Sequence, residues 1–268
     1  MLNREDPLTQ KQMADHFEIP EGTLRGYIKI LNRKLIKKRK VHAMTEANIA
    51  TRFTRSWGLY LMLRKSRYRK VMSSDEAWFY FRGSNEKRAV QYIKTSETRA
   101  DAGVNSHVEH PVGVMAWICF DENGCFTPIF VDMGAKINSD YFIVKVLKPF
   151  AKEYNKKYPQ KDMLFQQDSA PAHVSKKTIE FLEGTGIPYI KPCQWIPRSP
   201  DATPCDYWLW GYLKNRVNKR KVKNISGLKK VIREEVKNIP LDMIERVMRS
   251  WPRRMRKIRY ARGGHIEK

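Results

Sequence analysis

Hydrophobic and polar positions near the start of the chain alternate with the period of α-helices. Between residues 8 and 31 the pattern fits a helix-turn-helix. Its apolar positions are Met13, Ala14 and Phe17 on the first helix, Ile19 in the turn, and Leu24 and Tyr27 on the second. We expect Thr9 to cap the first helix. Glu18 stands in the turn where this motif usually has glycine, and an ordinary helical hairpin remains the alternative on pattern alone.

The outer face of the second predicted helix is polar and basic, as a helix that enters a DNA groove requires. Its exposed positions are Thr23, Arg25, Gly26, Lys29, Asn32 and Arg33. A basic cluster follows, made of Lys37, Lys38, Arg39 and Lys40, which suits a nuclear import signal, a phosphate-contacting arm or both. We therefore predict DNA contacts from Thr23, Arg25, Lys29, Arg33 and the basic cluster.

The remainder of the chain predicts a basic linker, one helix and then an alternation of strands and helices. We expect a helix at residues 45–63 after the linker. Residues 77–81 are apolar on both faces, as in a central strand buried on both sides. Residues 113–120 and 126–133 form a hairpin around Asn123-Gly124. Later segments are a helix at 141–158, strands at 163–167 and 188–190, a helix at 174–183, and a helix after residue 206 with Leu209, Trp210, Leu213 and Val217 at helical spacing.

Charge then narrows the class of partner. The 52 Lys and Arg exceed the 28 Asp and Glu, which gives a net charge of +24, and the basic residues gather at 33–40, 214–223 and 252–262. Such self-repulsion favours a polyanionic partner, with a merely soluble lysine-rich surface as the alternative. The chain has no apolar run of the roughly 18 residues that a membrane helix needs, and its start lacks a signal-peptide pattern. We expect a soluble, intracellular protein that makes no membrane contact.

Three carboxylates carry the candidate chemistry. Asp75 lies in the first predicted strand, Asp168 follows a later strand, and Asp206 precedes a late helix, so all three can meet at one edge of a sheet. Two carboxylates 4 Å apart repel by about 4 kcal/mol at an effective dielectric of about 20. They therefore hold protons or bind cations, and oxygen donors without a Cys or His cluster favour Mg²⁺ or Mn²⁺ over zinc. Two such ions can cleave and join phosphodiesters.

The residues around these acids resemble a known family. Ser74-Asp75-Glu76-x-Trp78, Gln167-Asp168-x-Ala170-Pro171-x-His173 and Ser199-Pro200-Asp201-x-x-Pro204-x-Asp206-Tyr207 resemble the three catalytic signatures of mariner-type transposases of the Tc1/mariner superfamily. The resemblance extends over nearly the whole chain from Leu8. It implies an α/β fold with an RNase H-like mixed sheet flanked by helices, preceded by a small helix-turn-helix segment. It also implies that Asp75, Asp168 and Asp206 are the catalytic residues and hold two Mg²⁺ or Mn²⁺ ions.

The residues beside the three acids receive more ordinary interpretations. In the family's pattern the metal ligand directly precedes an aromatic residue, so we choose Asp206 and expect Asp201 to cap its own loop. Between Asp168 and Asp206 lie 37 residues, a spacing that resembles a sister clade of the mariner elements proper. For His173 two interpretations remain open: it either supports Asp168 or contacts DNA, or it has a purely structural role. Trp208 and Trp210 are expected in the core, with base stacking as the alternative, and Glu76 should face the other side of its strand.

The resemblance also implies a domain order and a function. We expect a partial helix-turn-helix segment with basic linker at 1–40, a linker helix at 41–70 and the catalytic domain with basic C-terminal helices at 71–268. The family has two helix-turn-helix units, and this chain begins inside what resembles the second, so we expect an N-terminally shortened member. The implied function is nuclear cut-and-paste DNA transposition by a homodimer on double-stranded transposon ends and target DNA. A transposase-derived DNA-binding protein without catalysis, or a different RNase H-like nuclease, remains as an alternative.

Overall fold

The computed structural model describes residues 8–33, 43–80, 112–220, 222 and 224–267. The chain divides into two compact units, Met1–His42 and Ala43–Lys268. Each unit has its own hydrophobic core among the described residues. The predicted Phe81 end of the first strand and the basic cluster Lys37, Lys38, Arg39 and Lys40 lie outside the described residues.

The N-terminal unit contains the two predicted helices, α1 at Gln10–His16 and α2 at Glu21–Ile30. Thr9 caps α1 as predicted, because its side chain accepts from the backbone N–H of Gln12 while the Gln12 side chain accepts from the N–H of Thr9. Glu18 makes the turn at φ 54°, so a non-glycine residue adopts the left-handed conformation there.

The core of this unit differs from the apolar pattern of the sequence at two positions. Met13, Ala14, Leu24 and Ile28 are buried, whereas Phe17 and Tyr27 are each 54% exposed. Phe17 lies beyond the last residue of α1, and Ile28 rather than Tyr27 follows Leu24 by four residues on the same helix face. Phe17 and Tyr27 therefore fit the apolar pattern of the sequence but do not join the core, and Phe17 lies just beyond the helix on which it was expected.

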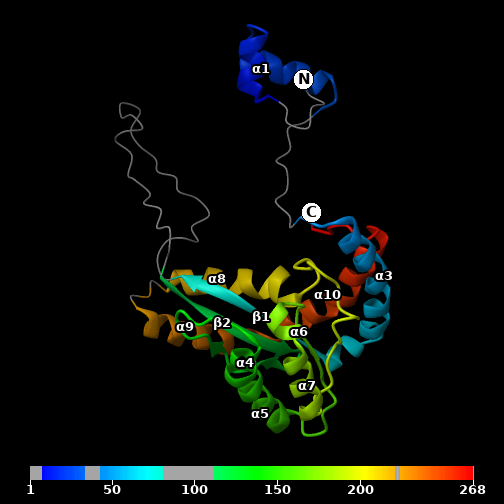
Figure 1. Cartoon of the computed structure of the whole chain (residues 1–268). Coiled ribbons are helices and arrows are strands. Elements are labelled where there is room, and N and C mark those ends of the chain that lie inside the picture. The colour runs from blue at the N-terminus through cyan, green and yellow to red at the C-terminus, as the bar shows by residue number, and fades with distance from the viewer. Residues whose placement is uncertain (1–7, 34–42, 81–111, 221, 223, 268) are drawn as a thin grey trace. The chain divides into compact units, whose positions relative to one another are not determined.

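The larger unit is built on a mixed sheet, as predicted (Figure 1). Its strands are β1 at Val71–Tyr80, β2 at Gly113–Asp121, β3 at Gly124–Cys125, β4 at Ile129–Phe130 and β5 at Leu164–Gln166. β1 pairs antiparallel with β2 and parallel with β5. β3 and β4 both pair with β2, so the predicted hairpin is present with a return strand in two pieces. Pro128 falls between these pieces, where a residue without an N–H interrupts a ladder.

Helices surround the sheet. The prediction at 45–63 is matched by α3 at Glu46–Leu63, which Thr45 caps, and the 310-helix η1 follows at Arg67–Lys70. The predicted helix at 141–158 is a continuous run of α4 at Ser139–Tyr141, the π-helix η3 at Phe142–Leu147 and α5 at Lys148–Lys157. The later helices are α6 at Pro171–Val174, α7 at Lys176–Thr185, the π-helix η4 at Cys205–Leu209, α8 at Trp210–Lys219, α9 at Ile225–Lys237 and α10 at Leu241–Tyr260.

Two predicted strand features are weaker than expected. The segment 188–190 contributes a single parallel bridge between Tyr189 and Phe165. In β1, Ala77 and Phe79 are buried but Trp78 is 42% exposed, so this part of the strand is fully packed on one face only. β5 pairs with β1 only at Val71–Ser73, which leaves the 77–80 end paired with β2 alone among the described strands.

Alternate residues of the sheet enter two separate cores. In β2, Ile118 and Phe120 pack with residues of α8, α9 and α10, whereas Trp117 and Cys119 pack with residues of η3, α5 and α7. The sheet therefore lies between two helical layers, which Figure 1 shows on either side of β1 and β2. In the part of the chain that is described, no helix is both long and apolar enough to cross a membrane.

Candidate active site

Asp75 lies in the middle of β1, on the face covered by α8. The indole Nε1 of Trp210 donates to Asp75 Oδ2 at 2.8 Å. Burial, the charge of Asp206 and the charge of Glu76 together hold the pKa of Asp75 well above its usual value. Negative charge is therefore crowded around Asp75, and a cation placed there would relieve it.

The parallel pairing of β5 with β1 fixes where the loop that carries the second acid, Asp168, begins. Ser73 pairs with Gln166, the last residue of β5, and Asp168 follows two residues later in the loop after this strand. Two side chains lock this register, since Ser73 Oγ donates to Gln166 Oε1 at 2.8 Å and Ser74 Oγ donates to the Gln166 carbonyl at 3.0 Å. β5 therefore ends beside Ser73, two residues before Asp75 on β1, and the convergence of Asp168 with Asp75 stays a prediction.

Asp206 enters the site from η4, the π-helical segment that leads into α8. Its neighbour Cys205 places its sulfur 3.7 Å from Ser73 Oγ on β1, which brings this segment against the strand. The influence of Asp206 on the pKa of Asp75 shows that the two carboxylates interact. π-Helical turns recur at functional sites because they shift the side chains that follow. Asp206 itself is exposed to solvent.

One face of the late helix carries two further residues of the site that were not predicted there. Trp210 and Lys214 follow Asp206 by four and eight residues, so the three share a helix face. Burial lowers the pKa of Lys214, while the charges of Asp206 and Asp75 oppose this effect. Spacing of four residues from Asp206 was the signal that could have identified both.

Asp168 is held by residues of its own loop and by β1. Its Oδ1 accepts from the Ala170 N–H at 2.9 Å and lies 2.5 Å from His173 Nδ1, while His173 Nε2 lies 3.2 Å from Glu76 Oε1. Burial favours neutral forms of both groups, but the hydrogen bond with His173 lowers the pKa of Asp168. Likewise, despite burial, bonds to Asp168 and Glu76 raise the pKa of His173 to about 10. Asp168 and His173 thus each favour the charged form of the other.

The described residues contain no group of three or more His, Cys, Asp or Glu side chains arranged to hold a metal ion. The structure brings Asp75 and Asp206 into interaction, and it engages Asp168 with His173. Hard oxygen donors and mutual repulsion suit the Asp75–Asp206 pair to Mg²⁺ or Mn²⁺. The donor chemistry therefore fits a divalent cation between Asp75 and Asp206.

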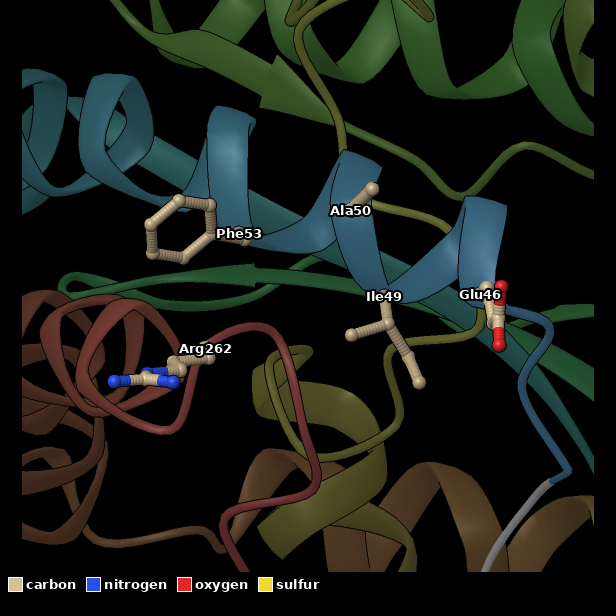
Figure 2. Close-up of a pocket in the computed structure, with 5 residues that line it drawn as sticks. All are labelled: Glu46, Ile49, Ala50, Phe53 and Arg262. Atoms are coloured by element: carbon tan, nitrogen blue, oxygen red, sulfur yellow. The ribbon is translucent and has the colours of Figure 1, made fainter.

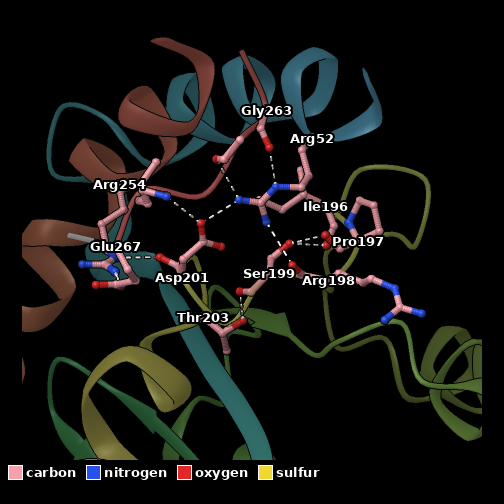
Figure 3. Close-up of polar contacts among 12 residues, drawn as sticks. Arg52, Ile196, Pro197, Arg198, Ser199, Asp201, Thr203, Arg254, Gly263 and Glu267 are labelled. Atoms are coloured by element: carbon pink, nitrogen blue, oxygen red, sulfur yellow. Dashed lines mark hydrogen bonds and ion pairs between the residues drawn. The ribbon is translucent and has the colours of Figure 1, made fainter. Parts of the chain in front are cut away.

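Asp201 has a different environment, shown in Figure 3. Its Oδ2 lies 2.7 Å from Arg52 Nη2, and both side chains are almost fully buried. The Ile266 N–H donates to the same oxygen at 3.3 Å, and the Asp201 carbonyl accepts from Arg254 Nε at 2.7 Å. The prediction that Asp201 caps its own loop was wrong, because its carboxylate instead joins that loop to α3 and to the C-terminal segment. This burial in an ion pair supports the choice of Asp206 over Asp201.

The two tryptophans lie where the sequence predicted. Trp210 is buried and packs edge-on against Phe79, and Trp208 is partly buried against Phe120 and Tyr212. Trp210 therefore combines a core position with its hydrogen bond to Asp75.

The residues predicted to contact DNA are placed as far as the structure describes them. Thr23, Arg25 and Lys29 are exposed on α2, and Arg33 is exposed beyond its end. Arg25 pairs with Glu21 one turn earlier on the helix, at 2.9 Å. Exposure is what a groove-reading helix requires, so these four residues remain predicted DNA contacts.

Two pockets of the larger unit lie away from these acids. One pocket of about 380 Å³ is lined by Glu46, Ile49, Ala50 and Phe53 of α3 and by Arg262 from the turn after α10 (Figure 2). A second, of about 710 Å³, lies along α5 and is lined by Thr127, Ile129, Pro149, Lys152, Glu153, Lys156 and Lys157. Neither of these two linings includes Asp75, Asp168 or Asp206.

Sequence comparison with known proteins finds several relatives of this chain. No protein-family model matches the chain. The Tc3 transposase of Caenorhabditis elegans is 33% identical over 156 residues, which cover 57% of this chain and 45% of that protein. The Mos1 mariner transposase of Drosophila mauritiana is 22% identical over 249 residues, which cover 87% of this chain and 68% of that protein. The human histone-lysine N-methyltransferase SETMAR is 23% identical over 88% of this chain and 34% of its own length.

The Tc3 and Mos1 homologues of this chain are Tc1/mariner transposases. The chain spans less than half the length of the Tc3 and SETMAR proteins that it matches. Among solved structures, a Mos1 paired-end complex with the left transposon end matches 99% of this chain and 77% of the Mos1 chain, with a TM-score of 0.83 and 21% identity. The Mos1 catalytic domain matches 85% of this chain and all of the domain, with a TM-score of 0.67 and 20% identity. The predicted RNase H-like fold is thus confirmed.

Proposed function

We propose that this chain is a metal-dependent DNA transposase that cleaves at terminal inverted repeats and transfers the strand to target DNA. The observation that carries the proposal is the crowding of Asp75 and Asp206, and it is supported by the position of Asp168 two residues after β5, the strand that pairs with β1. The homologues' names, and the solved Mos1 strand transfer complex, support the reaction class.

In this proposal Asp75, Asp168 and Asp206 hold two divalent ions, Mg²⁺ or Mn²⁺. Solved Mos1 complexes contain Mn and Mg, which supports the choice of ion. The bound ions would activate the attacking oxygen and stabilise the leaving oxygen of the phosphodiester. The protein's own groups fix the carboxylates: Trp210 orients Asp75 through Oδ2, and Ala170 and His173 hold Oδ1 of Asp168.

Double-stranded DNA is the proposed partner. The exposed residues Thr23, Arg25, Lys29 and Arg33 would meet the transposon end, together with the basic cluster Lys37, Lys38, Arg39 and Lys40. If about eight cationic side chains of the protein reach phosphates, the log–log slope of affinity against salt should be roughly −7. A homodimer on DNA and a nuclear location complete the proposal, supported by the Mos1 paired-end complexes.

A transposase-derived DNA-binding protein without catalysis is the second candidate. It is favoured by one observation, namely that the Asp168 carboxylate is bonded to His173. In that case the basic surface would bind DNA, and the three acids would not support cleavage.

One assay separates the two functions. Purified protein is incubated with Mg²⁺ or Mn²⁺ and a duplex that carries the element's inverted repeat, either flanked or pre-nicked. Cleavage by the wild type that is lost in Asp75→Asn, Asp168→Asn and Asp206→Asn, but kept in the control Asp140→Asn, supports the enzyme. Asp140 is a suitable control because it is exposed and pairs with Lys177. Binding without cleavage in every preparation supports the DNA-binding protein.

A further inference from the structure

His173 forms a bridge between two carboxylates from different elements. Nδ1 lies 2.5 Å from Asp168 Oδ1, and Nε2 lies 3.2 Å from Glu76 Oε1. The His173 side chain is 5% exposed, whereas that of Asp168 is 46% exposed. A buried imidazole therefore links an exposed candidate ligand to a partly buried acid of β1.

Glu76 and Asp75 occupy adjacent positions of one strand and so point to opposite faces of the sheet. The bridge accordingly approaches Asp168 from the face opposite Trp210, which holds Asp75. Each of the two acids thus has its own buried partner that fixes one carboxylate oxygen.

The imidazole is itself held rigidly. The backbone N–H of His173 donates to the Ala170 carbonyl at 2.8 Å, and the His173 carbonyl accepts from Gln167 Nε2 at 3.0 Å. The ring lies 4.1 Å from the Phe142 ring, centroid to centroid, and 30° from its plane. A side chain fixed by its backbone, by one ring face and by both ring nitrogens has little freedom, so it can determine where Asp168 points.

We infer that Glu76 and His173 are positioning residues, which fix Oδ1 of Asp168 so that the carboxylate presents its other oxygen to a divalent cation. This inference rests on the proposed metal site. Both described hydrogen bonds of the Asp168 carboxylate end on Oδ1, as expected if Oδ1 is held by the protein and Oδ2 is left for the cation. Groups behind a metal ligand orient it, and losing one typically costs on the order of 10- to 100-fold in metal affinity or activity.

The sign of the effect distinguishes positioning from charge. Any positive charge on this imidazole would repel Mg²⁺ or Mn²⁺, so an effect of charge alone would tighten metal binding when His173 is replaced by a neutral residue. Positioning predicts the opposite, because Asp168 would lose its orientation.

Two amides of different length make the test specific. In His173→Asn the amide nitrogen falls near the place of Nδ1 and can still donate to Asp168, whereas in His173→Gln it falls near Nε2 and reaches toward Glu76 instead. Both variants remove the ring and its charge, so their effects on folding should be similar. Mn²⁺ binding to the full chain, measured by electron paramagnetic resonance and calorimetry, is compared with thermal midpoints and with DNA cleavage.

We expect His173→Gln to weaken Mn²⁺ binding by at least tenfold and His173→Asn to weaken it less, at similar thermal midpoints. Glu76→Gln should fall between the wild type and His173→Gln, while Glu153→Gln, whose carboxylate accepts from the Thr127 N–H on another part of the domain, should match the wild type. Equal Mn²⁺ affinity in both His173 variants, or tighter binding than in the wild type, would overturn the inference. If the wild type binds Mn²⁺ in this pattern but never cleaves DNA, the proposed function fails and the positioning role stands.

Discussion

The buried ion pair between Arg52 and Asp201 allows the sharpest test of which acid is structural. Asp201→Asn keeps the size of the side chain and removes its charge. The 2.7 Å contact lies between side chains that are 0% and 2% exposed, so solvent cannot replace the lost partner. Removing one partner of a buried pair costs about 3–5 kcal/mol.

The lower end of that range applies here. Arg52 keeps other acceptors, because its Nε donates to the Gly263 carbonyl at 2.8 Å and its Nη1 to the Arg198 carbonyl at 3.2 Å. We therefore expect a loss of about 3 kcal/mol, which corresponds to a fall of roughly 6–12 °C in the thermal midpoint of a domain of this size.

The assay is thermal unfolding followed by circular dichroism, with three comparisons. Asp242→Asn breaks an exposed pair with Arg246 on α10 and should leave the midpoint nearly unchanged. Arg52→Met combined with Asp201→Asn should cost less than the sum of the two single changes, because the two side chains interact. Below its midpoint, Asp201→Asn should still cleave DNA in the presence of metal, whereas Asp206→Asn should not.

Two results would refute this reasoning. Additive costs, or a midpoint shift under about 2 °C, would mean that the pair contributes little to stability. Cleavage lost in Asp201→Asn but kept in Asp206→Asn would make Asp201 the ligand and reverse the assignment.

Three further predictions concern other contacts. Trp210→Phe keeps the ring in the core but loses the 2.8 Å bond to Asp75, so cleavage should require more Mg²⁺ at half-maximal rate, with little change in midpoint. Gly263→Ala should destabilise by at least about 1–3 kcal/mol in denaturant unfolding, since φ there is 85° and a Cβ would lie 2.1 Å from a carbonyl oxygen of α3. Hydrogen bonding to Arg216 lowers the pKa of Glu235, so the ionised carboxylate stabilises the folded protein above the unfolded pKa and this stabilisation is lost as the pH falls. Glu235→Gln should therefore flatten the curve of thermal midpoint against pH on the acid side. An unchanged curve would contradict this.

Much of the fold could be predicted because local patterns agreed with the tertiary structure. Helix α3, the β2–β3 hairpin and β5 lie within a few residues of their predicted positions, since capping and turn residues act over short distances. Errors came where packing decided the outcome. Phe17, Tyr27 and Trp78 are apolar, but only the arrangement of neighbouring elements determines which apolar side chains are covered.

For the site, the sequence by itself determined which acids to consider and the order in which they occur. It could not determine their partners, because hydrogen bonds between segments depend on distances that no local spacing encodes. The structure alone decided that Asp201 is buried against Arg52, 149 positions away, and that Trp210 reaches Asp75 across 135 positions. It alone also placed His173 between Asp168 and Glu76, because β1 and α6 meet only once the sheet and the loop after β5 have folded together.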